Sequence, residues 1–208
     1  MTVTTSLYEQ LFPLTTIMKQ RFVEWFLGKE IDLGIWQKTN IAGSGSFAMV
    51  DAVDEGYEVS SAAGGSNQSE LDFNNIRHYV HNASVIILAF RRVTATTFNE
   101  NGLGNVITGA STDTACAMES TGNTFKNLRT GDATVVSESA SDLVIDTIHT
   151  LYKIVCASTV IQLYINGLLK VSKTTNRPTQ KMQPLVHAGN LAAVVATTRI
   201  KFLEAYNT

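Results

Sequence analysis

Two acidic residues, Glu30 and Asp32, stand two positions apart in the run EIDLG. In a β-strand, residues two positions apart project from the same face, so both carboxylates would enter one cleft. Two carboxyl groups about 5–5.5 Å apart are what a retaining glycosidase needs. The next position on that face is Gly34, so a third acid is missing. The pair meets only half of the chemical requirement, and we expect no catalysis from it.

A second acidic group consists of Asp51, Asp54 and Glu55, which flank Gly56. Calcium takes about six to eight oxygen ligands, and three neighbouring carboxylates could supply part of such a shell. The alternative is a solvated turn between two strands. We favour the turn, and the sequence leaves calcium binding open.

The histidines give no metal site. His78 and His81 are three positions apart, and on a helical turn both would lie on one face. Zinc needs at least one further protein ligand, and His149 and His187 lie far away in the sequence. We therefore expect surface or structural histidines, and no cofactor. The sequence also lacks a Ser–His–Asp arrangement, a phosphate loop and a CxxC pair.

Aromatic side chains offer a different chemistry, the stacking of a sugar ring. The candidates for glycan contact are Trp36, Tyr57 and Tyr79. Packing in the core or at its rim is the competing explanation for most aromatic residues of the chain. A carbohydrate-binding module or lectin therefore enters as the alternative function.

The elements that must position these residues are β-strands. Short apolar runs recur between Gly, Asn, Asp and Ser, which is typical of a β-sandwich. The clearest signal is the stretch 151–173, where Asn166-Gly167 predicts a type I′ hairpin turn that pairs Ile165 with Leu168 and Tyr164 with Leu169. Both faces of this hairpin are mostly apolar near the turn. It should therefore lie in the middle of a packed sheet or beneath a neighbouring subunit.

The first 28 residues differ in pattern. Apolar residues recur there at steps of three and four, which predicts an amphipathic helix from near Leu14 to Gly28. We expect residues 1–28 to form a helical extension and residues 29–208 the sandwich. The helix would cover a sheet of its own domain or dock on another subunit. The assembly interface would comprise Leu11, Leu14, Met18, Phe22, Trp25 and Phe26.

Composition excludes several classes of protein. Of the 208 residues, 44% are hydrophobic and 16% charged, and the net charge of −2 argues against a nucleic-acid partner. Cys116 and Cys156 are too few for a disulfide framework; we favour buried free thiols and leave a single bridge open. We see no signal peptide, no apolar run of about 20 residues and too few basic residues on the helix for a membrane role.

Several short motifs resemble concanavalin A-like and laminin-G-like jelly-roll domains. In that family an opening Phe-x-Gly-x-x-x-Asp-x-x-x-Trp segment leads into a strand and an acidic glycine turn. The matching residues are Phe26, Gly28, Asp32 and Trp36, followed by Phe47, Asp54, Gly56 and Tyr57. VIQLYINGLLK resembles the family's late hairpin and RIKFLEAY its closing strand, so the resemblance spans about residues 25–206. EIDLG is similar to the Glu-Ile-Asp-x-Glu strand of the family's glucanases, without its last acid.

The resemblance implies an all-β jelly-roll sandwich, here with a short N-terminal amphipathic helix. The Ser/Thr/Asn-rich style and the added helix are similar to bacteriophage and other viral virion proteins of this fold. We therefore expect a non-enzymatic structural protein of the virion, such as a capsid decoration or fibre-like protein. Its partners would be other copies of itself, capsid or tail proteins and, in the alternative, glycans. Deleting residues 1–28 should then leave a folded sandwich and abolish assembly.

Overall fold

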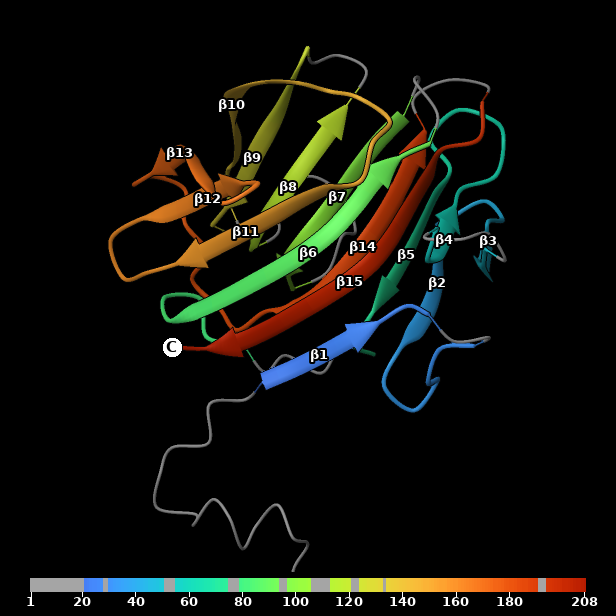
Figure 1. Cartoon of the computed structure of the whole chain (residues 1–208), viewed down its shortest axis with the longest axis horizontal. Coiled ribbons are helices and arrows are strands. Elements are labelled where there is room, and N and C mark those ends of the chain that lie inside the picture. Colours follow the sequence, from blue (N-terminus) through green and yellow to red (C-terminus); the bar gives the residue numbers. More distant parts are fainter. Residues whose placement is uncertain are drawn as a thin grey trace, which may run out of the picture.

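The protein is a sandwich of two antiparallel β-sheets, seen as two layers in the computed structural model of Figure 1. The structure describes residues 21–27, 30–50, 55–74, 79–93, 97–105, 113–120, 124–132, 134–190 and 194–208. Within these ranges the regular structure is all β, as the sequence predicts.

The eight-stranded sheet has the order β13-β12-β11-β6-β15-β4-β3, with β1 paired to β15 beside this path. Its strands are β1 (Arg21–Trp25), β3 (Ser46–Met49), β4 (Tyr57–Ser60), β6 (Ser84–Arg92), β11 (Thr150–Cys156), β12 (Ile161–Ile165), β13 (Leu168–Lys173) and β15 (Thr197–Asn207). The long strands β6 and β15 pair along most of their length and form the middle of this layer (Figure 1).

The seven-stranded sheet has the order β10-β9-β8-β7-β14-β5-β2. Its strands are β2 (Gln37–Ala42), β5 (Gln68–Asp72), β7 (Thr97–Gly104), β8 (Thr114–Ser120), β9 (Phe125–Gly131), β10 (Val136–Val144) and β14 (Gln183–Asn190). Non-consecutive neighbours such as β7 and β14 show that the chain crosses repeatedly between distant parts of the sheet.

One hydrophobic core fills the space between the sheets. Strand residues alternate between two faces, and most of the inward residues of each sheet are buried. From the seven-stranded sheet it includes Leu71, Leu103 and Val186, and from the eight-stranded sheet Leu88 and Leu203. The other face of the seven-stranded sheet is therefore its outer face, and we use that name for it below.

The predicted hairpin is confirmed at its turn. Asn166 and Gly167 have φ angles of 50° and 82°, and Ile165 pairs with Leu168 as expected. Its predicted place in the middle of a sheet is wrong, because β13 is an edge strand and Leu168 is 64% exposed. Cover by a neighbouring subunit stays a prediction.

The predicted N-terminal helix is not supported. Residues 21–25 form strand β1, which pairs with β15 from Arg21↔Tyr206 to Trp25↔Phe202. Leu11, Leu14 and Met18 lie outside the described residues. The backbone hydrogen bonds that a helix would make within itself are replaced here by bonds to β15, so the described sheet begins before the boundary expected at residue 28.

Both cysteines are free and buried, as favoured from the sequence. Cys116 lies on β8 and Cys156 on β11, in different sheets. No helix with the length and hydropathy of a bilayer span occurs in the part of the chain that the structure describes.

Candidate functional site

A row of ionisable side chains crosses the outer face of the seven-stranded sheet. Glu70 on β5, His187 on β14 and Glu100 on β7 are direct cross-strand partners in the register of the sheet. All three are almost completely buried, although alternation points them away from the core. Buried carboxylates are rare unless they have partners, so this row is the first candidate for function.

The Glu100 carboxylate is the most perturbed acid of this face. Its Oε1 atom lies 2.5 Å from Nε of Arg129, a residue of β9. Burial raises the pKa of Glu100 to about 7, against the lowering effect of the Arg129 charge. The same guanidinium lies 3.4 Å, through Nη1, from Oε1 of Glu138 on β10. One arginine thus lies between a buried acid with a raised pKa and a more exposed acid.

His187 stays neutral in the middle of the row. Burial, together with the Arg129 charge, lowers the pKa of its imidazole to about 3. Nε2 lies 3.3 Å from Oε1 of Gln68, while Nδ1 has no hydrogen-bond partner. The ring of Phe98 meets the imidazole edge-on at 5.4 Å between centroids. Opposite the Gln68 carbonyl oxygen Nε2 carries the ring proton, so the buried Nδ1 is a hydrogen-bond acceptor.

A pocket of about 400 Å³ opens beside this row. Its lining combines the Phe98 ring and the Met118 side chain with polar groups from Gln68, Ser120 and Glu138. Gly189 forms part of the wall, where an added Cβ would lie 3.1 Å from Cδ1 of Phe98. The glycine therefore leaves room beside the ring. An apolar surface with a few hydrogen-bonding groups is the usual composition of a small-molecule site.

The carboxylates expected to share a strand face, Glu30 and Asp32, lie elsewhere. Residues 30–35 form a bend and a turn, and the Asp32 carboxylate accepts a hydrogen bond of 2.8 Å from the Gly34 amide. Both side chains are exposed. The shared face assumed for them requires a strand, which is absent here because Asp32 stabilises the turn instead.

The aromatic residues proposed for glycan contact belong to the core. Trp36, Tyr57 and Tyr79 are 1%, 1% and 2% exposed. Phe26 packs between Trp36 and Tyr57, with ring centroids 5.7 and 6.0 Å away. At this burial none of these three rings presents an open face to a sugar; the partly exposed ring of Phe98 lines the outer-face pocket instead.

The residues proposed for the assembly interface divide in two. Phe26 is 2% exposed, and Phe22 packs edge-on against Trp36 and Phe73, so both contribute to the core. Trp25 is 60% exposed and covers Phe202 on β15. Of the described members of the set, Trp25 alone presents a large apolar surface to a partner.

The remaining polar candidates are only partly described. Asp51, Asp54 and His78 lie outside the described residues. Glu55 is held by Arg91 and Arg199, and their hydrogen bonds, Arg91 first, lower its pKa to about 2. Across the residues that the structure describes, no three metal-binding side chains come together. The turn favoured for Asp51, Asp54 and Glu55 stays a prediction, with calcium binding as its alternative.

Sequence reasoning missed the outer-face row. Its three members and the adjoining Arg129 and Glu138 come from five strands between residues 70 and 187, and only the sheet register brings them together. One local signal exists: QSELD and FNENG carry a glutamate within a strand that has few other charges. From the sequence alone, such a glutamate is expected to face solvent. Only the order of the strands shows that it is buried.

Comparison with solved structures identifies the fold. A Bacillus licheniformis β-glucanase superposes with a TM-score of 0.68 at 14% identity, over 90% of this chain and 98% of that one. A prokaryotic β-1,3-1,4-glucanase (lichenase) from a mouse hindgut metagenome gives 0.69 at 12%, over 90% and 98%. The carbohydrate recognition domain of Emp47p gives 0.62 at 11%, over 90% and 94%.

These likenesses establish a concanavalin A-like jelly roll, the fold that the sequence motifs resemble. No protein-family model matches the chain, and no curated protein matches it. The expectation of a non-enzymatic protein is corrected, because the fold is shared with β-glucanases. Nothing in the comparisons supports a virion context, whereas the carbohydrate alternative gains support.

Proposed function

We propose that the protein binds a glycan in the outer-face pocket beside Phe98. The observation that carries the proposal is the combination, within about 400 Å³, of an aromatic ring with polar groups on three strands. A sugar ring has apolar C–H faces and a rim of hydroxyls, which match such a lining. The shared fold of a carbohydrate recognition domain and two glucanases supports the same class of ligand.

The polar groups of the pocket would form different hydrogen bonds with a sugar. The amide of Gln68 and the hydroxyl of Ser120 each donate and accept hydrogen bonds, and the Glu138 carboxylate accepts them from hydroxyls. Arg129 lies 5.5 Å from the Phe98 ring centroid, which fixes the ring from the side of β9. The Phe98 ring and the hydrogen-bonding side chains of the pocket thus lie on strands and not on loops.

The test is titration of the protein with soluble β-glucans and with unrelated polysaccharides. Phe98→Leu keeps an apolar side chain and removes the ring face, so we expect binding about five- to tenfold weaker, since stacking contributes on the order of 1–1.5 kcal/mol. Trp25→Ala, which removes an exposed aromatic ring from the other sheet, should leave the affinity unchanged. Equal affinity of the Phe98→Leu variant would contradict the proposal.

A second candidate function is glycoside hydrolysis, favoured by the two carboxylates on either side of Arg129. Glu100 would be the proton donor, because burial raises its pKa to about 7, and Glu138 would be the second carboxyl group. Contact with one guanidinium is compatible with the separations of about 5–9.5 Å that glycosidases use. Glu100→Gln should then abolish release of reducing sugar and preserve binding. Activity that survives this substitution would exclude Glu100 as the acid.

The assembly function remains a prediction from the sequence, with copies of the chain or with capsid or tail proteins as partners and the virion as its location. The exposed ring of Trp25 is the described feature on which it would depend. Native mass of the wild type and of Trp25→Ala would test it.

A further inference from the structure

Two rows of cross-strand partners on the outer face carry more acidic than basic side chains. One row contains Glu70, His187 and Glu100, and the neighbouring row contains Asp72 and Arg129. Residues that pair directly across strands point to the same face, so the register assigns both rows to it. The charged members of the two rows are four carboxylates and one guanidinium: Glu70, Asp72, Glu100, Glu138 and Arg129.

The excess of acidic groups persists when burial is taken into account. Burial raises the pKa of Glu100 to about 7, so this carboxyl group carries only part of a charge near neutral pH. Burial lowers the pKa of the His187 imidazole to about 3, so the ring adds no positive charge there. Even with Glu100 protonated, three carboxylates of these rows stand against the guanidinium of Arg129. Such a face attracts cations and repels anions.

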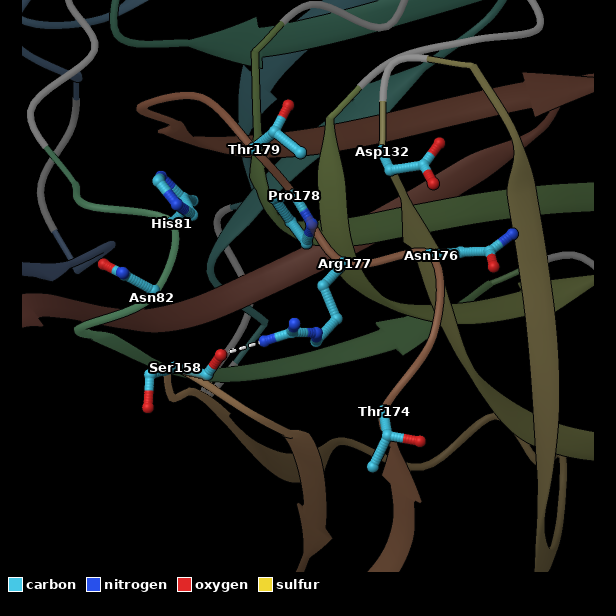
Figure 2. Close-up of a pocket in the computed structure, with 9 residues that line it drawn as sticks. All are labelled: His81, Asn82, Asp132, Ser158, Thr174, Asn176, Arg177, Pro178 and Thr179. Carbon is cyan, nitrogen blue, oxygen red and sulfur yellow. Dashed lines mark hydrogen bonds between the residues drawn. The ribbon is translucent and has the colours of Figure 1, made fainter.

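Two other cations do not remove the excess. Lys173 interacts with Glu138, but it belongs to β13 of the other sheet. Arg177 lies at the end of the sandwich, where Figure 2 shows its guanidinium bonded to the Ser158 carbonyl in a separate pocket that Asp132 also lines. Arg177 is not part of the outer-face pocket. With Lys173 counted, the carboxylates still outnumber the cations.

Two buried acceptors on the same face lack a donor. Nδ1 of His187 and Oδ1 of Asn127 have no hydrogen-bond partner. The orientation of the Asn127 amide follows from its Nδ2, which donates to Oε2 of Glu138 at 3.4 Å. Asn127 is the cross-strand neighbour of Met118, and His187 is two residues from Gly189; Met118 and Gly189 line the outer-face pocket. A ligand that donates hydrogen bonds therefore suits this face better than one that only accepts them.

Glu138 is the carboxylate that a ligand in the pocket can reach. It lines the pocket with Phe98 and its side chain is 34% exposed, whereas Glu70 and Glu100 are 2% exposed. Arg129 approaches Glu100 at 2.5 Å and Glu138 only at 3.4 Å, so its charge lies nearer to the buried acid. A protonated amine beside Glu138 would form a charge-assisted hydrogen bond. The Phe98 ring also attracts cations, and Arg129 already lies 5.5 Å from its centroid.

We propose that the outer-face pocket takes a glycan whose sugars carry protonated amines, such as an oligomer of glucosamine, with an ammonium group paired to Glu138. The inference rests on the proposed glycan function and names the substrate class of that site. Stacking on Phe98 would be common to all sugars, whereas Glu138 and the other carboxylates of the face would distinguish amino sugars from neutral ones. An acidic glycan would bring like charges together and bind more weakly.

The experiment is calorimetric titration of the full chain with four tetramers that share a β-1,4 linkage. They are cellotetraose, the glucosamine tetramer, the N-acetylglucosamine tetramer and a glucuronate tetramer. At about pH 6 and about 20 mM salt, we expect the glucosamine tetramer to bind at least about fivefold tighter than the two neutral tetramers, and the glucuronate tetramer to bind most weakly. Equal affinity for the glucosamine tetramer and cellotetraose would overturn the inference.

Two variants with the same change of charge test the assignment to Glu138. The quantity compared is the affinity for the glucosamine tetramer divided by that for cellotetraose. Glu138→Gln should reduce this ratio to less than about twofold. Glu204→Gln, on β15 of the other sheet, where Glu204 pairs with Arg21, should leave the ratio unchanged. A preference that survives Glu138→Gln in folded protein would mean that Glu138 is not the partner of the amine.

Salt dependence of the wild-type ratio is a second measurement, which does not depend on the folding of a variant. The ratio should fall between about 20 and about 300 mM salt, because salt screens charges at a partly exposed site. A ratio that stays constant would contradict a charge-based preference.

The Phe98→Leu variant separates this inference from the glycan proposal. If cellotetraose binds and Phe98→Leu weakens its binding, while the glucosamine tetramer binds no tighter, the pocket is a glycan site and the amino-sugar assignment is wrong. If none of the four tetramers binds, both proposals are wrong.

Discussion

At the level of single residues, Glu100 and His187 show how burial on the outer face disfavours the charged form of an ionisable group. Both are direct neighbours across β7 and β14, and burial dominates both titrations. Burial raises the pKa of an acid and lowers that of a base, because it disfavours the charged form in each case. The two groups therefore affect the pH dependence of stability with opposite signs.

The first prediction concerns the Glu100 carboxyl group. Its pKa is about 7 in the folded state and 4.5 as its ordinary value, so between these the folded state binds more protons. Stability from this group is complete below pH 4.5 and is lost as the pH rises through 7, by about 3 kcal/mol. Urea unfolding at pH 4.5, 5.5, 6.5 and 7.5 should show the decline as a difference between the wild type and Glu100→Gln.

The wild type must be compared with Glu100→Gln because the His187 imidazole also changes the stability over the same pH range. Its pKa falls from 6.5 to about 3, so its contribution to stability grows as the pH rises from 3 to 6.5 and offsets Glu100 in part. Gln does not titrate, so the change of the difference with pH reports the Glu100 carboxyl group, including its interaction with Arg129. A difference that stays constant from pH 4.5 to 7.5 would mean that the Glu100 pKa is not raised.

At the level of elements, the second prediction concerns the approach of β15 to the start of β4. Gly56 has a φ of 79°, and an added Cβ would lie 2.2 Å from the Ile200 carbonyl oxygen. Backbone cannot give way as a flexible side chain can, so Gly56→Ala should lower the free energy of unfolding by at least about 2 kcal/mol. Chemical denaturation measures this directly.

Two other glycines provide matched controls. Gly167 has a φ of 82° but open space around its Cβ position, so Gly167→Ala should cost only the left-handed strain, about 1–2 kcal/mol. Gly65 has open space and no positive φ, so Gly65→Ala should stay within about 0.5 kcal/mol. If Gly56→Ala and Gly65→Ala are equally stable, the close approach of β15 does not constrain this position.

Elements that depend on local geometry could be predicted from the sequence. Strand β1 could not, because its structure depends on a distant partner strand. Asn166-Gly167 specifies its turn by itself, whereas the run RFVEWF admits either a helix or a strand. In β1 the side chains of Phe22 and Glu24 face inward, where the Glu24 carboxylate accepts a bond of 3.4 Å from the Trp36 indole. Because the inward Glu24 is polar and the outward Trp25 is apolar, the segment lacks the alternating hydrophobic pattern of a strand. Pairing with β15, about 180 residues later in the chain, makes this segment a strand and not a helix.

The candidate site lies beyond sequence reasoning for a related reason. Glu70, Glu100, Arg129 and His187 share no motif spacing, because cross-strand neighbours in this topology are separated by tens of residues. The carboxylates that do have motif spacing, Glu30 and Asp32, lie in a turn. Spacing within a strand predicts a shared face, but only the order of strands shows which faces form a site.

At the level of the whole molecule, the N-terminal strand closes one side of the sandwich. Phe22 and Phe26 pack with Trp36, Phe73 and Tyr57 in an aromatic cluster that joins β1 to both sheets. The β1 segment therefore contributes to the fold itself. Deleting residues 1–28 would therefore disturb the fold as well as any assembly. A deletion alone does not distinguish the two effects.

The third prediction replaces that deletion with two point variants. Phe26→Ala should lower the free energy of unfolding by about 3–5 kcal/mol, because the ring is fully buried. Since domains are stable by only about 5–15 kcal/mol, deleting residues 1–28 should broaden or abolish the unfolding transition. Trp25→Ala should cost about 1 kcal/mol or less and leave the fold intact, because the ring is mostly exposed. Sedimentation of the wild type and Trp25→Ala then measures assembly in folded protein. A cooperative transition of wild-type midpoint in the deleted chain would show that the sandwich does not need β1.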